Sequence, residues 1–304
     1  MKVSDGSGDQ DLNMKTKRKI WLGVGAFVVA GTGAISAPLA AEMPSIDSFR
    51  SSSSLATDTA IPRARSGGVV FAQHVDHPKE AGEGGESKGV ANLPPDLAFA
   101  VRIALLRGHL FIGDELVKQK QWNAALPHFL HPIEELYDDM RAPLADYKIS
   151  PFDDALKALA DVVKAKNGND YVKRLKAVSD ALAAVDVAMT EKQTDWPGFV
   201  AEAAIESIKT AAGEYENALV DGRIAKPVEY QDARGFIWQG ARMIDSVAAG
   251  LHKKDAAALN AVRSGLAELK KVFPAAMPPK RPVKDHAALL AIIARVELAA
   301  GKLM

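Results

Sequence analysis

Two histidines, four acidic residues and a proline lie within one short segment, HFLHPIEELYDD, which runs from His128 to Asp139. Imidazole nitrogens and carboxylate oxygens together suit iron, zinc and copper. The chain has no cysteine, so thiolate ligands are excluded. On a helix, His128, His131 and Glu135 would share one stripe, roughly opposite the apolar side chains of the segment. The segment is therefore a candidate cation site.

Pro132 interrupts this segment. A proline has no backbone N–H, so the carbonyl of His128 loses its helical partner and the helix should kink. The freed carbonyl would then lie beside the imidazoles. An earlier histidine, His109, has leucines and isoleucine at helical offsets, which points its ring inward or into a pocket. A structural role is the alternative: the helix dipole favours acids after Pro132, and the histidines could hydrogen-bond across a helical hairpin.

A second group of acids brackets a short loop, residues 222–226. Two of them lie on the outgoing helix and two on the returning helix, which begins at Pro227: Glu214, Asp221, Glu229 and Asp232. Two carboxylates from each of two helices is how helical bundles build cation sites. Capping, and ion pairs with Arg223 and Arg234, are the alternative. The two groups form one site only if the two hairpins pack side by side.

The elements that must position these residues are helices. The helical pattern begins at Pro94 and, apart from a Pro-rich loop before a last helix over residues 286–300, continues through the chain, and alternation of β-branched residues is nowhere sustained. Aromatic residues make up only 6% of a chain that is 48% hydrophobic, which favours close packing of small side chains. We predict an all-α fold of about eight helices, as an antiparallel bundle or stacked helical hairpins, in one domain over residues 91–304.

The N-terminal third has a different composition. Basic residues precede an apolar stretch, residues 20–41, that ends in small residues. This pattern predicts an export signal over residues 1–41, with Met14 as an alternative start and an uncleaved membrane anchor as the alternative role. Residues 42–90 are rich in Ser, Gly, Pro and charge, which predicts a disordered linker. We therefore expect a periplasmic or otherwise exported domain, which contacts a membrane only if the signal is retained.

Charge and motifs exclude other classes of function. Lys+Arg and Asp+Glu both number 38, so the chain lacks the basic footprint of a nucleic-acid-binding protein. No Ser/His/Asp order, glycine-rich phosphate loop or HExxH motif is present in the helical region. We therefore expect a protein that is not an enzyme and that has no nucleic-acid partner.

One stretch carries a family resemblance. The sequence EYENALVDGRIAKPVEYQDARGF, residues 214–236, resembles the periplasmic helical region attached to bacterial high-affinity iron permeases. The residues that carry the resemblance are Glu214, Tyr215, Ala218, Asp221, Gly222, Ile224, Glu229, Tyr230 and Phe236. The REXXE pattern of the permease membrane helices is absent, so the resemblance implies a periplasmic component and not transport. The GxHxxE motif of related imelysin-type iron proteins does not fit Gly108-His109 and the residues that follow.

Two functions follow as hypotheses. The first is a metal-handling protein of iron uptake, with copper or zinc as alternative ions and haem left open, and with a permease or cytochrome as envelope partner. Its metal binding should weaken below about pH 6.5, where imidazoles become protonated. The second is a docking module for an envelope protein, because the hairpin around His109 and His128 resembles a tetratricopeptide unit. That module predicts an apolar groove beside Trp122, although a solenoid needs about three such units.

Overall fold

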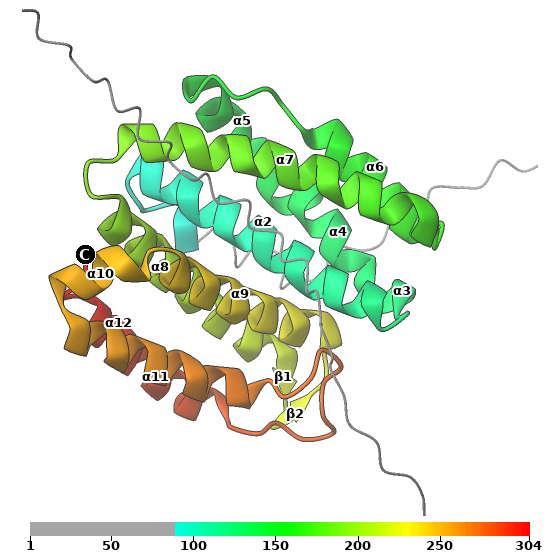
Figure 1. The fold of residues 1–304 in the computed structure, drawn as a ribbon. Helices are drawn as coiled ribbons and strands as arrows, with labels where there is room; N and C mark the ends of the chain where they lie inside the picture. The colour runs from blue at the N-terminus through cyan, green and yellow to red at the C-terminus, as the bar shows by residue number, and fades with distance from the viewer. Residues whose placement is uncertain (1–88) are drawn as a thin grey trace, which may run out of the picture. The chain divides into compact units, whose positions relative to one another are not determined.

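The structure, a computed structural model, describes residues 89–304. The predicted export signal, residues 1–41, and nearly all of the predicted linker, residues 42–90, lie outside the described residues. The regular elements of the described part are helices apart from one two-stranded hairpin, which confirms the predicted all-α class (Figure 1). Among these residues, no helix has both the length and the apolar character needed to cross a membrane.

The elements follow one another through short connections, except for the longer loop over residues 273–285 before the last helix. In chain order they are α2 (Pro95–Lys118), α3 (Trp122–Ala125), α4 (Pro127–His131), the π-helix η1 (Pro132–Leu136), α5 (Tyr137–Asp146), α6 (Asp153–Lys164), α7 (Gly168–Lys192), α8 (Trp196–Ala218), β1 (Leu219–Val220), β2 (Arg223–Ile224), α9 (Pro227–Ser246), α10 (Ala248–Lys254), α11 (Ala256–Val272) and α12 (His286–Ala300).

Aspartate caps fix the starts of three C-terminal helices. The carboxylates of Asp195, Asp255 and Asp285 each accept a hydrogen bond from the backbone N–H three residues further along the chain. These bonds satisfy N–H groups that the first turn of a helix leaves without a partner. They begin α8, α11 and α12, so local sequence alone defines much of the C-terminal bundle.

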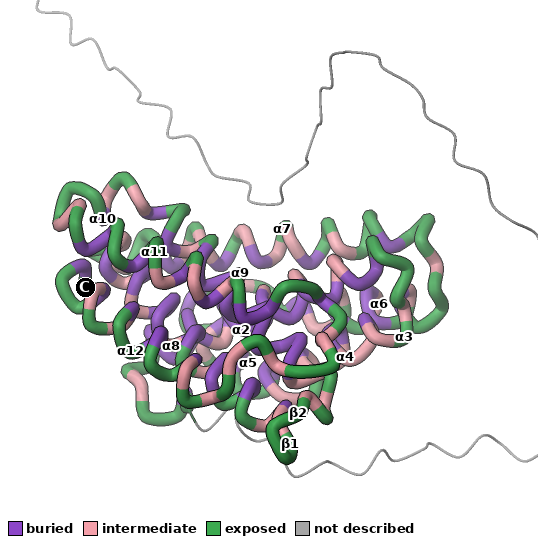
Figure 2. The backbone as a smooth tube through the Cα atoms, turned by 90° about the horizontal axis from the view of Figure 1, so that it is seen from below, coloured by how far each residue is buried: buried purple, intermediate pink, exposed green. Residues whose placement is uncertain are grey.

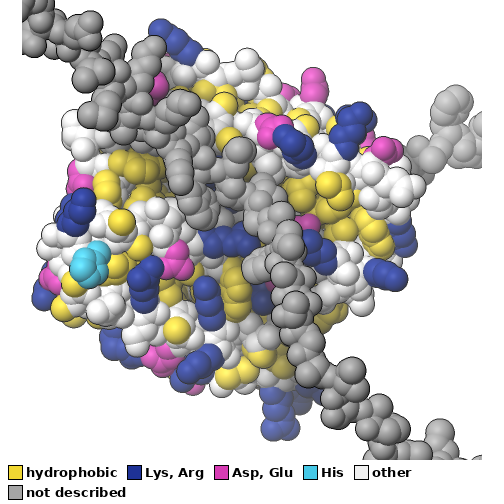
Figure 3. Space-filling view, in the orientation of Figure 1, with side chains coloured by type: hydrophobic (Ala, Val, Ile, Leu, Met, Phe, Trp, Pro, Cys, Tyr) yellow, Lys and Arg dark blue, Asp and Glu magenta, His cyan; other side chains and the backbone are white. Residues whose placement is uncertain are grey.

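Four helices of the C-terminal half, α8, α9, α11 and α12, pack together, and α2 lies across α8 and α9 (Figure 1). The buried residues concentrate along α2, α8 and α9, which form the middle of the molecule (Figure 2). The helices α6 and α7 pack on each other beyond α2. Basic and acidic side chains both appear on the surface, in line with the balanced charge of the sequence (Figure 3).

The crossing of α2 and α9 is unusually close because a glycine lies at the contact on each helix. A Cβ atom added to Gly235 would lie 2.5 Å from the carbonyl oxygen of Gly108. A Cβ atom on Gly108 would lie 2.5 Å from the ring of Phe236. The two backbones therefore touch, so His109, next to Gly108, faces Asp232, which lies one helical turn before Gly235.

The hairpin between α8 and α9 differs from the prediction, which continued the outgoing helix to Asp221. The helix ends at Ala218, and the strands pair antiparallel with Leu219 opposite Ile224. Asp221 and Gly222 have φ angles of 50° and 69°, as a two-residue type I′ turn requires. Asp-Gly is a strong signal for this turn, and it overrides the helical pattern before it.

The close crossing generates a stability prediction. Gly235→Ala should destabilise the protein by about 1–3 kcal/mol, because its methyl group has no space against the backbone of α2. Gly213→Ala is the matched control: Gly213 lies in α8, and a Cβ atom there would meet nothing within 4 Å. The control should be neutral or stabilising by up to about 1 kcal/mol. Urea unfolding followed by circular dichroism measures both, and equal effects would contradict the close-crossing interpretation.

Candidate metal site

Three segments bring two histidines to one buried carboxylate. His109 comes from α2, His128 from α4 and Asp232 from α9, and all three side chains are buried. Nδ1 of His109 and Nδ1 of His128 each lie 2.7 Å from Oδ1 of Asp232. An ionised carboxylate can only accept hydrogen bonds, so both rings donate to the same oxygen. The predicted histidine group and one member of the predicted acidic group thus form a single cluster.

His131 and Glu135 extend this cluster toward the surface. Nδ1 of His131 lies 3.4 Å from Oδ2 of Asp232, an oxygen that is buried and without a hydrogen-bond partner in the described structure. Nε2 of His131 lies 3.9 Å from Oε1 of Glu135. The side chains of His131 and Glu135 are 15% and 13% exposed. This pair therefore lies between the buried carboxylate and solvent.

The interruption predicted at Pro132 takes the form of the π-helix η1, which separates α4 from α5. Pro132 supplies no N–H to the carbonyl of His128, so the local helix widens and the next residues bond five positions back. The wider turn keeps His131 and Glu135 in contact while His128 points into the core. Short π-helical turns of this kind are frequent at functional sites.

Gln231 is a residue of the cluster that sequence reasoning missed. Its Oε1 lies 3.0 Å from Nε2 of His128, and its Nε2 donates to the sulfur of Met277 at 3.6 Å. Gln231 is buried and directly precedes Asp232. No sequence pattern marks it, because a buried glutamine on a helix looks the same as an exposed one until the packing is known.

The surroundings of the cluster favour an ionised carboxylate on Asp232 and a protonated imidazole on His131. Burial alone would raise the pKa of Asp232, but the neighbouring rings of His109 and His128 outweigh burial and hold that pKa well below its usual range. Burial opposes protonation of His131, yet the contact with Asp232, helped by Glu135, raises the pKa of His131 to about 9. A carboxylate and an imidazolium therefore face each other at neutral pH.

The other acids of the predicted second group occupy three different positions on α8, the β1–β2 turn and α9. Glu214 is buried in α8, and Glu229 lies in the first turn of α9, where Oε1 is 3.9 Å from Nζ of Lys226. Asp221 is exposed on the turn between β1 and β2. Asp221 therefore has a conformational role in the hairpin, whereas Asp232 contacts the imidazoles of His109, His128 and His131.

The geometry is close to that of a metal site. The ligand atoms of His109, His128 and Asp232 all lie within 4.8 Å of one another. Metal bonds to such atoms are about 2.0–2.2 Å long, which places tetrahedral ligands about 3.4 Å apart. The 2.7 Å contacts would thus have to open by less than about 1 Å to admit an ion. His131 is already at this spacing from Asp232.

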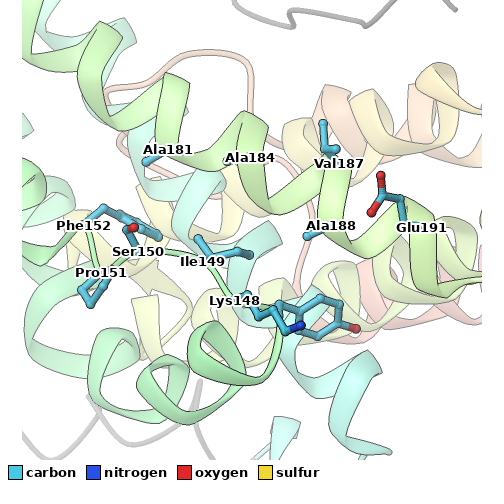
Figure 4. A pocket seen from close by; sticks show the side chains of 11 residues that line it. Lys148, Ile149, Ser150, Pro151, Phe152, Ala181, Ala184, Val187, Ala188 and Glu191 are labelled. Carbon is cyan, nitrogen blue, oxygen red and sulfur yellow. The ribbon is translucent and has the colours of Figure 1, made fainter.

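A separate hollow of about 590 Å³ lies between the loop that follows α5 and one side of α7. Apolar side chains, among them Ile149, Phe152 and Ala181, form most of its wall (Figure 4). None of the predicted ligands lines it. Beside Trp122, where the docking hypothesis predicts an apolar groove, the ring packs edge-on against Tyr171 on α7, and the groove stays a prediction.

The raised pKa of His131 generates a pH prediction for the metal-free protein. Folding stabilises the protonated ring, so this contribution is complete below the unfolded pKa of about 6.5 and is lost as the pH rises through about 9. The free energy of unfolding should fall by up to about 3 kcal/mol between these limits. His131→Gln should remove this fall, and the exposed-site control His252→Gln should keep it. Urea unfolding at a series of pH values tests the difference.

Comparison with known proteins adds one finding. No curated protein and no solved structure matches the chain. The region from the end of α7 through α12 contains Asp232 of the cluster. The three histidines of the cluster lie before this region in the chain. Residues 190–304 match the family model of the iron permease-associated 4-helix bundle domain, which confirms the resemblance predicted from residues 214–236.

Proposed function

We propose that this protein is a periplasmic, non-enzymatic component of an iron-permease system and that it binds ferrous iron at the buried cluster. The observation that carries the proposal is Asp232, a fully buried carboxylate with imidazoles on both of its oxygens and with Oδ2 lacking a hydrogen-bond partner among the described residues. Matched residues 190–304 support the link to iron uptake. The export signal predicted over residues 1–41 supports the location.

The ligand types support a divalent transition metal. Imidazole nitrogen with carboxylate oxygen suits Fe²⁺, Zn²⁺ and Cu²⁺, and two histidines with one carboxylate is a familiar set for ferrous iron. The carboxylate offsets part of the charge of the ion, and the metal displaces the proton of His131. Zinc and copper bind such sites at least as tightly as iron, so the supply of metal decides which ion is carried. The contacts of 2.7 Å favour an ion over haem, because a porphyrin would need the rings to separate much further.

Gln231 supports the same assignment. A metal on Nδ1 of His128 requires the ring proton on Nε2, and Oε1 of Gln231 lies 3.0 Å from that nitrogen, ready to accept it. Partners of this kind, which fix the tautomer and orientation of a ligating histidine, are typical of metal sites. Gln231→Ala should therefore weaken metal binding by about tenfold or more without removing a ligand.

The metal proposal is tested by calorimetric titration of chelator-treated, full-length protein with Fe²⁺ under anaerobic conditions, and with Zn²⁺ and Cu²⁺. We expect saturable binding of one ion with a Kd of about 1 µM or below. Asp232→Asn and the double change His128→Ala with His131→Ala should abolish it. The controls Asp221→Ala and His252→Ala alter an acid and a histidine that are exposed, and they should bind as the wild type does.

Two measurements keep this test decisive. Circular dichroism establishes whether each variant retains its helices, and the single change His131→Gln provides a milder variant. Wild-type affinity should rise from pH 6 to about pH 9, because the raised pKa of His131 moves the range of proton competition above the unperturbed value of 6.5. Absence of saturable binding with all three ions, or unchanged binding in folded Asp232→Asn, would overturn the metal proposal.

A further inference from the structure

A row of cations and aromatic rings lies on the outer side of α9, apart from the buried cluster. We name it the cationic strip; its members are Arg234, Trp238 and Arg242 of α9, Lys270 of α11 and Phe111 of α2. The guanidinium carbon of Arg234 lies 4.0 Å from the ring centre of Trp238, and Nζ of Lys270 lies 5.6 Å from the same centre. The guanidinium carbon of Arg242 lies 4.4 Å from the ring centre of Phe111.

The acids near the cationic strip already have basic partners. Glu115 pairs with Arg234, and Asp245 pairs with Arg263. Asp114 pairs with Lys118 and also accepts a hydrogen bond from the hydroxyl of Tyr171. Among the described residues, no ion pair is formed by Arg242 or Lys270. The cationic strip therefore carries positive charge that the fold itself does not neutralise.

Two further observations show that this charge is poorly compensated by the surrounding residues. The side chain of Arg234 is only 7% exposed, and its Nε has no hydrogen-bond partner in the described part of the chain. Burial, together with nearby Arg242 and Arg234, lowers the pKa of Lys270. Cations that repel one another on a partly buried aromatic surface gain from an anion that contacts several of them at once.

The geometry points to a docking site for an acidic segment of a partner protein, with carboxylates on Arg242 and Lys270 and an apolar contact on Trp238. The combination of two cations with an aromatic ring favours a segment over a small anion. Arg234, Trp238 and Arg242 share one face of α9 and span about 12 Å, at about 1.5 Å per residue. Arg234 is already paired with Glu115, so the segment would contact Arg242, Lys270 and the ring of Trp238, and a phosphate supplies no apolar group for that ring. This inference is independent of the metal site.

The test uses a rhodamine-labelled hexaglutamate peptide and the full-length protein, followed by fluorescence anisotropy. We expect saturable binding that weakens as the salt concentration rises from about 0.05 M to about 0.3 M. Arg242→Glu and Lys270→Glu should each weaken binding by about tenfold or more. Lys173→Glu is the matched control, since it makes the same change of charge at an exposed position of α7 and should leave binding nearly unchanged.

Two probes separate the proposal from its competitors. A hexaglutamine peptide should not bind, and citrate or inorganic phosphate should compete with hexaglutamate only weakly. Equal competition by these small anions would make the cationic strip a small-anion site and overturn the proposed segment. The proposal is also overturned if the wild-type protein shows no saturable binding of hexaglutamate, or if both charge-reversal variants bind the peptide as tightly as the wild type does.

Discussion

The contact between the backbones of Gly108 and Gly235 is the constraint on which the rest of the structure depends. It draws α2 and α9 together so closely that no side chain fits between them. The side chains next to the two glycines then have little conformational freedom. The ring of His109 packs edge-on against the ring of Phe236, with the ring centres 5.0 Å apart, and its Nδ1 contacts Asp232. A buried carboxylate is costly without partners, and this crossing, with α4 beside it, supplies them. The same helix crossing therefore determines both the close packing of the core and the polar contacts of Asp232.

Much of the fold could be predicted from sequence because its signals are local. Asp255 marks a helix start through its own side chain, and the helical period follows directly. The inward direction of His109 could be read from its apolar neighbours. The Asp-Gly pair was also a local signal, but its interpretation as part of a helix and as a ligand put Asp221 in the wrong conformation. The error came from giving carboxylate chemistry more weight than turn geometry.

The composition of the site could not be predicted because it depends on which hairpins pack side by side. Periodicity shows the face of a helix on which Asp232 lies, but it does not show which helix that face meets. The pairing of α2 with α9, residues more than a hundred positions apart, selects Asp232 and leaves Asp221 outside. The role of Gln231 as a hydrogen-bond partner of His128 can be recognised only once the packing places the two side chains together. Likewise, the sequence shows that Pro132 lacks a backbone N–H. The π-helical form of the turn could not be predicted, because it depends on tertiary contacts.

The matched domain begins at residue 190, and the buried cluster straddles that boundary. Asp232 belongs to the matched bundle, while His109, His128 and His131 come from the helices before it. In this chain, the buried aspartate of the bundle therefore depends on side chains that lie outside the matched residues. A bundle transplanted without its N-terminal helices would carry a buried charge with its imidazole partners missing, so selection should replace the aspartate wherever those helices are lost. We therefore expect position 232 to covary with positions 109, 128 and 131 among related chains.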